Sequence, residues 1–151
     1  MNYRHAFHAG NFADVMKHAL LTLSINQLKK KEKPFFLLDT HAGSGMTDLS
    51  GEEAQKTDEY RQGIARLLEA EDDIPASLAP YLDAVRALGG TPLTRYPGSP
   101  ALAAYLARGM DRLAFVEIEH APGQDCAELF KRDPRVKVHE MDGYQAMRAM
   151  L

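Results

Sequence analysis

The chain has little of what extracellular and membrane proteins depend on. Cys126 is the one cysteine among 151 residues, so an internal disulfide is excluded and a reducing compartment is favoured. Its apolar residues never form a run long enough to span a bilayer. Met1 leads into Tyr3-Arg4-His5, which does not resemble a signal peptide. These absences predict a cytoplasmic protein without a membrane segment.

Several catalytic signatures are also missing. There is no Gly-x-Ser-x-Gly elbow for a nucleophilic serine, and no cysteine or carboxylate cluster joins His5 and His8 into a recognisable zinc set. The glycine-rich stretch that ends at Gly45 is followed by Met46-Thr47, where a phosphate-binding P-loop needs Lys-Ser/Thr. Asp48 stands where a dinucleotide fingerprint needs a third glycine. Metal-dependent chemistry and nucleophilic hydrolysis are therefore not expected.

Charge is unevenly distributed along the chain, although the net charge is only -3. Before Pro34, six lysine and arginine residues face only Asp14 and Glu32, whereas residues 48 to 83 are rich in acids. The basic segment could contact phosphates. Alternatively, the lysines at 29 to 33 complement the negative end of a helix dipole. The sequence does not decide between these two interpretations.

Hydrophobic spacing predicts alternating helices and strands. Asn11 caps a first helix whose buried face is Phe12, Val15, Met16, Ala19, Leu20 and Leu23, with Asp14, Lys17 and His18 away from it. Strands are expected at 35–38, buried on both faces, at 113–117, and at 136–138 as a half-exposed edge. Residues 46–95 show no strand signal and predict two helices, the second closed by Gly89-Gly90. Further helices are expected from a Ser99 cap to Gly109, from 123 to 131, and from Asp142-Gly143 to Leu151.

This order predicts an α/β fold of the Rossmann-like class, with a parallel sheet between helical layers. Right-handed crossovers give the strand order 3-2-1 and leave an open edge on the first strand. The chain then divides into an amino-terminal arm and helix (1–34), a helical insertion (46–95), and a sheet domain formed by 35–45 with 96–151. At 151 residues it is short for a complete nucleotide-binding sheet of six or seven strands.

Three acids lie where the three strands end. Asp39 precedes the glycine-rich turn with Gly43 and Gly45, Glu117 ends the second strand, and Asp142 follows the third. A turn of small residues beside an acid suits S-adenosylmethionine, which carries no phosphate, and an acid at a strand tip can bind ribose hydroxyls. Asp142 could hold an adenine amino group. Two alternatives to ligand binding stay open. The glycine-rich stretch could simply be a tight strand-to-helix turn, and each acid could be a helix cap.

The opening stretch Tyr3-Arg4-His5-Ala6-Phe7-His8-Ala9-Gly10-Asn11-Phe12-Ala13-Asp14-Val15-Met16-Lys17-His18 resembles the start of the large-subunit ribosomal RNA methyltransferase J family. The resemblance continues through the segments 38–45, 96–100 and 142–143, and so covers essentially the whole chain. It implies a class I methyltransferase fold, of which this chain holds strands 1 to 3, and S-adenosylmethionine-dependent N6 methylation of an adenine in 23S rRNA. It also implies cofactor contacts at Lys17, His18, His41, Gly43, Ser99, Glu117, Asp142 and Gly143. Tyr3 and Arg4 are expected at the RNA.

The chain departs from the family pattern in two ways. Ile118-Glu119-His120 follows Glu117 where the family usually has Leu-His-Pro, which affects the local loop. An Asp-Pro-Pro-Tyr motif, whose acid and carbonyl hold the target amine, does not occur in residues 1–151. We therefore expect this chain to be inactive by itself. The full-length protein is expected to be monomeric, with an edge-mediated dimer as the alternative for this chain. The alternative function is a non-catalytic nucleic-acid or nucleoside binding module, which an older family label links to use of external DNA.

Overall fold

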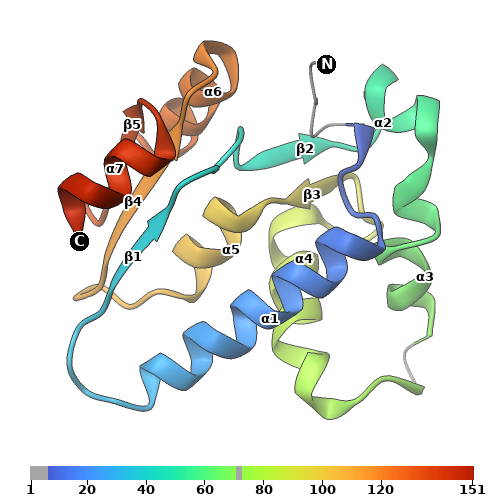
Figure 1. Cartoon of the computed structure of the whole chain (residues 1–151). Coiled ribbons are helices and arrows are strands. Elements are labelled where there is room, and N and C mark those ends of the chain that lie inside the picture. The colour runs from blue at the N-terminus through green and yellow to red at the C-terminus, as the bar shows by residue number, and fades with distance from the viewer. Residues whose placement is uncertain (1–6, 71–72) are drawn as a thin grey trace.

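The computed structural model describes residues 7–70 and 73–151, and a parallel three-stranded sheet forms one side of the molecule (Figure 1). Its strands are β1 (Phe36–Asp39), β4 (Arg112–Glu117) and β5 (Val136–Glu140), in the order β1-β4-β5. Both pairings are parallel, with Leu38 opposite Ala114 and Phe115 opposite Val138. The predicted fold class and strand order are confirmed. β4 lies in the centre, and β1 has an open edge.

Helices cover both faces of this sheet. Leu113 and Phe115 of β4 pack into one core with α5 (Ser99–Leu106), α6 (His120–Phe130) and Ile25 of α1. The opposite face of β4 is in contact with α7 (Gly143–Met150). β1 was predicted to be buried on both faces, and that is wrong, since Phe36 is 46% exposed. The central strand β4 is buried from Leu113 to Val116, whereas β1, at the edge of the sheet, is only partly covered.

The first helix, α1 (Phe12–Lys29), begins as predicted, but its buried face agrees with the predicted one only at Ala19 and, in part, Val15. The Asn11 side chain accepts a hydrogen bond from the Asp14 amide, which confirms the cap. Its buried positions, however, are Asp14, His18, Ala19, Thr22 and Ile25. Of the face predicted to be buried, Phe12, Met16, Leu20 and Leu23 are exposed. Polar side chains on α1 are buried because each finds a hydrogen-bond partner inside the protein, which a hydropathy pattern cannot show.

The insertion after the first strand contains two strands that the sequence did not indicate. β2 (Met46–Asp48) and β3 (Arg95–Pro97) pair antiparallel and bring the two ends of the insertion together. The elements between them, within the described residues, are α2 (Glu52–Thr57), η2 (Glu59–Arg61), α3 (Ile64–Glu69), η4 (Ala76–Leu78) and α4 (Ala79–Gly89), of which η2 and η4 are short 3-10 turns. These helices share a second core with α1 and α5, built around Ile64, Tyr81, Val85 and Leu102. The closure of α4 at Gly89-Gly90 is confirmed.

Three helix boundaries differ from the prediction by a few residues. Gly98, and not Ser99, is the cap of α5, which leaves Ser99 as the first helical residue. The same helix ends at Leu106, before Gly109, and α6 begins at His120, before Gly123. The first shift matters for the site, because it directs the Ser99 hydroxyl to another partner.

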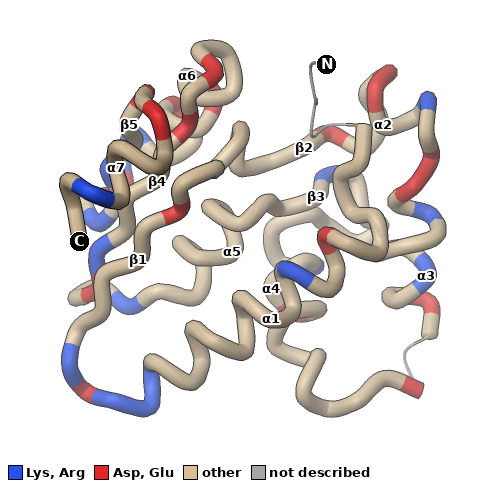
Figure 2. Tube along the Cα trace, in the orientation of Figure 1, with Lys and Arg blue, Asp and Glu red and all other residues tan. Residues whose placement is uncertain are grey.

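An arginine holds the basic loop that follows α1. The Arg108 guanidinium donates to the backbone carbonyls of Lys31 (2.8 Å) and Lys33 (3.0 Å), and to the carboxylate of the fully buried Asp111 (2.9 Å). The hydrogen bond from Arg108 holds the pKa of Asp111 down at about 2. Figure 2 shows the lysines of this loop at the end of α1 and mainly acidic positions around α2 in the insertion. The buried ion pair therefore fixes the loop that presents these lysines.

Candidate functional site at the strand tips

The turn that follows β1 is shaped by two glycines in the left-handed region. Gly43 has φ of 64°, and the space where its side chain would begin contains no atom within 4 Å. Gly45 has φ of 84°, and a Cβ there would lie 2.8 Å from Cδ2 of Leu129 on α6. Its carbonyl accepts the Gly98 amide at 2.8 Å, which attaches the turn to the start of α5. Gly45 is thus favoured by its left-handed backbone, and a side chain there would also displace Leu129, whereas Gly43 borders open space that a ligand can enter.

Asp39 joins the tip of β1 to the start of α5. One carboxylate oxygen accepts the Ser99 hydroxyl at 2.5 Å, and the other accepts the His41 amide at 3.1 Å. Ser99 was predicted as a cofactor contact, and here it also holds Asp39 in place. Asp39 therefore holds the glycine-rich turn in the conformation that a ligand would meet at this edge of the sheet.

Glu117 links the tip of β4 to the same turn. Its Oε2 accepts the Gly43 amide at 2.8 Å, and its Oε1 accepts the Glu119 amide at 2.9 Å. Carboxylate oxygens have several acceptor positions each, so both remain able to accept from a ligand hydroxyl. The structure thus brings together two residues that were predicted separately as cofactor contacts, Glu117 and Gly43, through backbone hydrogen bonds that orient the carboxylate.

Asp142 caps α7, as the alternative interpretation of this residue, a helix cap, predicted. Its side chain accepts the Gln145 amide at 2.9 Å. Gly143 is buried, and a Cβ there would lie 2.2 Å from the carbonyl oxygen of Thr40. Gly143 consequently lets α7 approach the turn after β1, and this contact places Asp142 beside the site.

His41 and Tyr144 form an aromatic pair at the exposed rim. Their rings lie 5.8 Å apart in an edge-to-face arrangement, and His41 Nδ1 lies 2.9 Å from the Thr40 hydroxyl. Tyr144 is 63% exposed. Sequence reasoning missed Tyr144, because an exposed aromatic in the first turn of a helix breaks no pattern. Its position directly after Gly143 was the available signal.

Beneath this site lies a thiol without reactive character. Cys126 on α6 is fully buried, and burial raises its pKa to about 12, with a further contribution from the charges of Asp39 and Glu117. Among the described residues, no group of three or more histidine, cysteine or acidic side chains could hold a metal ion. In the same part of the chain, no helix has the length and apolar character needed to cross a membrane.

Lys17 and His18 lie on α1, and within the described part of the chain their hydrogen bonds and ion pairs go to residues other than those at the strand tips. Lys17 pairs with Asp14 at 2.8 Å, and His18 is buried with its Nδ1 2.8 Å from the Tyr96 hydroxyl. Tyr96 lies on β3, two residues before Gly98, which bonds to Gly45. Through Tyr96 and β3, His18 is connected indirectly to the glycine-rich turn. Tyr3 and Arg4, the expected RNA contacts, lie outside the described residues.

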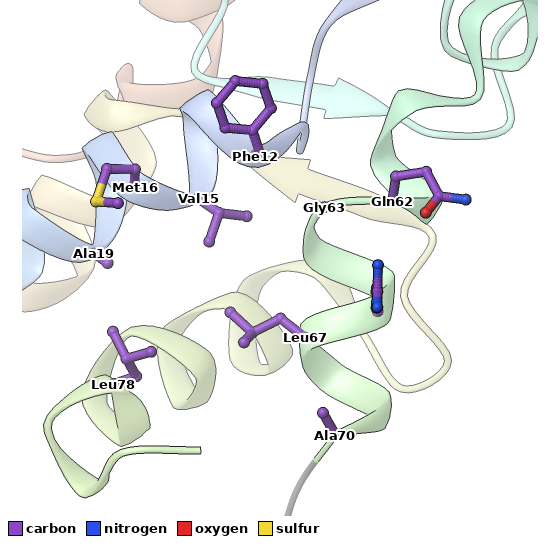
Figure 3. A pocket seen from close by; sticks show the side chains of 10 residues that line it. Phe12, Val15, Met16, Ala19, Gln62, Gly63, Leu67, Ala70 and Leu78 are labelled. Carbon is purple, nitrogen blue, oxygen red and sulfur yellow. The ribbon is translucent and has the colours of Figure 1, made fainter. Parts of the chain in front are cut away.

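A separate hollow lies between α1 and the insertion. It has a volume of about 430 Å³ and is mainly apolar, with Phe12, Met16, Leu67 and Leu78 among its lining residues (Figure 3). Arg66 also lines it. None of the strand-tip residues borders it. The hollow is formed by the apolar face of α1 that the structure leaves exposed.

Comparison with known proteins identifies the family. Residues 32–151 match the family model described as "Ribosomal RNA large subunit methyltransferase D, RlmJ". Two curated proteins named "Ribosomal RNA large subunit methyltransferase J", from Escherichia coli K12 and Haemophilus influenzae, are 43% and 42% identical over the whole chain. The chain spans about half the length of these relatives, 54% of each.

A solved structure agrees in fold. A crystal structure of a Legionella pneumophila protein, assigned to the family DUF519, superposes with a TM-score of 0.87 at 34% identity. The match covers 95% of this chain and 53% of that protein. The class I methyltransferase architecture expected from the resemblance is therefore shown at the level of fold. The chain belongs to the ribosomal RNA large subunit methyltransferase J family.

Proposed function

We propose that the protein to which this chain belongs is a cytoplasmic, S-adenosylmethionine-dependent methyltransferase that modifies N6 of an adenine in 23S rRNA. The names of its relatives support ribosomal RNA as the substrate. The observation that carries the cofactor assignment is the junction of Glu117 with Gly43, which sets an oriented carboxylate beside open space at the glycine-rich turn. This is the edge at which ligands bind to open α/β sheets.

Each strand-tip residue has a specific part in this proposal. Glu117 accepts hydrogen bonds from the ribose hydroxyls, and Gly43 permits the ligand to approach the backbone. Asp142 accepts from the adenine amino group of the cofactor, with Gly143 keeping it near the turn. The aromatic pair of His41 and Tyr144 borders the site. The bound cofactor supplies an activated methyl group.

Methyl transfer to an adenine amine needs a further group to hold the amine. Its lone pair is delocalised into the ring, so an acid and a carbonyl must orient it toward the methyl donor. Residues 1–151 contain no Asp-Pro-Pro-Tyr motif that could do this. We therefore propose that the chain by itself binds the cofactor weakly at best and does not turn over. Methylation of protein-free 23S rRNA by the purified chain would contradict this point.

The cofactor assignment is tested by calorimetric titration of the purified chain with S-adenosylmethionine. Glu117→Gln removes the charge while keeping one oxygen for the Gly43 amide, and we expect binding to weaken by about tenfold, equivalent to one charged hydrogen bond. Glu119→Gln is the matched control: this acid is two residues away and exposed, and its affinity should stay within about twofold of the parent. Equal affinities of the parent and Glu117→Gln would refute the assignment.

A further inference from the structure

A row of three buried polar groups joins α1 to the insertion. Nδ1 of His18 lies 2.8 Å from the hydroxyl of Tyr96, which lies 2.9 Å from the hydroxyl of Tyr81 on α4. Each of the three side chains is 1% exposed. Phenylalanine at positions 81 and 96 would fill the same space without burying a hydroxyl. The hydroxyls therefore call for an explanation other than packing.

The direction of the hydrogen bonds follows from counting protons. Burial raises the pKa of both tyrosines, so each hydroxyl keeps its proton and must donate it. Within the described residues, the hydroxyl of Tyr81 has no partner except that of Tyr96. Tyr81 must then donate to Tyr96. The proton of Tyr96 is left with one acceptor, Nδ1 of His18.

The opposite direction of hydrogen bonding, with His18 donating from Nδ1, leaves one buried proton without an acceptor. If His18 carried a proton on Nδ1 and donated it, Tyr96 would have to donate to Tyr81. The proton of Tyr81 would then be buried without an acceptor among the described residues, at a cost of roughly 1–3 kcal/mol for one unsatisfied group. A protonated imidazolium also carries a proton on Nδ1 and would leave the same buried Tyr81 proton without an acceptor among the described residues.

We infer that Tyr96 is a positioning residue that holds His18 as the neutral imidazole with its proton on Nε2. The stacking of the two rings, 5.6 Å apart and inclined by 30°, fixes the plane of the imidazole as well. His18 is thereby a hydrogen-bond donor at Nε2. On the proposed function, a cofactor contact at His18 is made to an acceptor on the ligand, such as a ribose or carboxylate oxygen, and not to its amine.

Nitrogen NMR of the imidazole rings tests the inference on the chain with ¹⁵N-labelled histidine, with His18→Gln used to assign the signal. In the parent, His18 should show an unprotonated Nδ1 and a protonated Nε2 at neutral pH. Tyr81→Phe should keep this pattern, because the Tyr96 proton still has only His18 as acceptor. Tyr96→Phe should change it, since Nδ1 loses its donor. A proton on Nδ1 in the parent, or unchanged His18 signals in Tyr96→Phe, would overturn the inference.

Cofactor titration of the same variants adds a functional reading. Tyr96→Phe should weaken S-adenosylmethionine binding by about tenfold, and Tyr81→Phe by no more than about twofold. If the parent chain fails to bind the cofactor, the proposed function fails while the NMR result stands. If Tyr96→Phe binds as tightly as the parent, the link from Tyr96 to the ligand is refuted. Should Tyr96→Phe not fold, the tautomer in the parent and in Tyr81→Phe still decides the case.

Discussion

The buried face of α1 leads to a prediction that separates the structure from the hydropathy pattern. Ile25 is 1% exposed and lies in the core against the sheet, whereas Leu20 on the same helix is 56% exposed. Hydropathy ranks the two residues as similar, and the predicted buried face contained Leu20 and not Ile25. Truncating each to alanine therefore distinguishes the two descriptions of the helix.

The magnitudes follow from burial. Ile25→Ala deletes buried carbon atoms and leaves a cavity, which costs about 2–4 kcal/mol of the free energy of unfolding. Leu20→Ala removes atoms that are already largely in water and should change that free energy by no more than about 0.5 kcal/mol. Alanine is also the best helix former, so helix propensity does not penalise either variant by more than a few tenths.

Urea unfolding followed by circular dichroism measures both effects. With about 2–4 °C of midpoint shift per kcal/mol for a chain of this size, Ile25→Ala should also melt roughly 5–15 °C below the parent. Thr22→Ala, on the buried face but polar, serves as an intermediate case that loses a hydroxyl bonded to the His18 carbonyl. If Leu20→Ala were as destabilising as Ile25→Ala, the orientation of α1 described above would be wrong.

Three further predictions concern the framework. The pKa of Asp111 is held at about 2 by Arg108, below its ordinary 3.8, so its stabilising contribution is present above about pH 4 and is lost as the pH falls toward 2. Asp111→Asn should thus cost at most about 2 kcal/mol at pH 7, and urea titrations should show the difference shrinking below pH 4. Gly143→Ala should unfold or distort the chain because its Cβ would meet the Thr40 carbonyl at 2.2 Å, while Gly109→Ala, which meets no atom within 4 Å, should fold normally by circular dichroism. Cys126 should resist a thiol reagent in the native state and react only on unfolding; rapid native labelling would contradict its burial.

What could be predicted from the sequence was what local chemistry determines. The cap at Asn11 and the cap at Asp142 each depend on residues within three positions, and both are observed. The strand order followed from apolar runs separated by helices, together with the handedness of crossovers. The positions of Asp39, Glu117 and Asp142 at the ends of the three strands could be predicted from the sequence, whereas the hydrogen bond between Glu117 and Gly43 could not.

The errors have a shared physical origin in partners that are distant along the chain. His18 and Thr22 look like surface residues, yet Tyr96 and a backbone carbonyl satisfy them in the interior. β2 and β3 are only three residues long and contain Asp48, Arg95 and Pro97, so neither carries an apolar signal. Their pairing depends on the ends of a long insertion meeting, which no short window of sequence contains. Tyr144 becomes a candidate only when His41 is seen beside it.

The central claim, that the strand tips bind S-adenosylmethionine, is tested most directly by following backbone amide signals during titration with the cofactor. We expect the largest shifts at Gly43 and Glu119, whose amides donate to Glu117, and at Tyr144 beside His41. Residues that line the apolar hollow, such as Leu67 and Leu78, should be unaffected. Shifts confined to that hollow, or no shifts at saturating cofactor, would contradict the account.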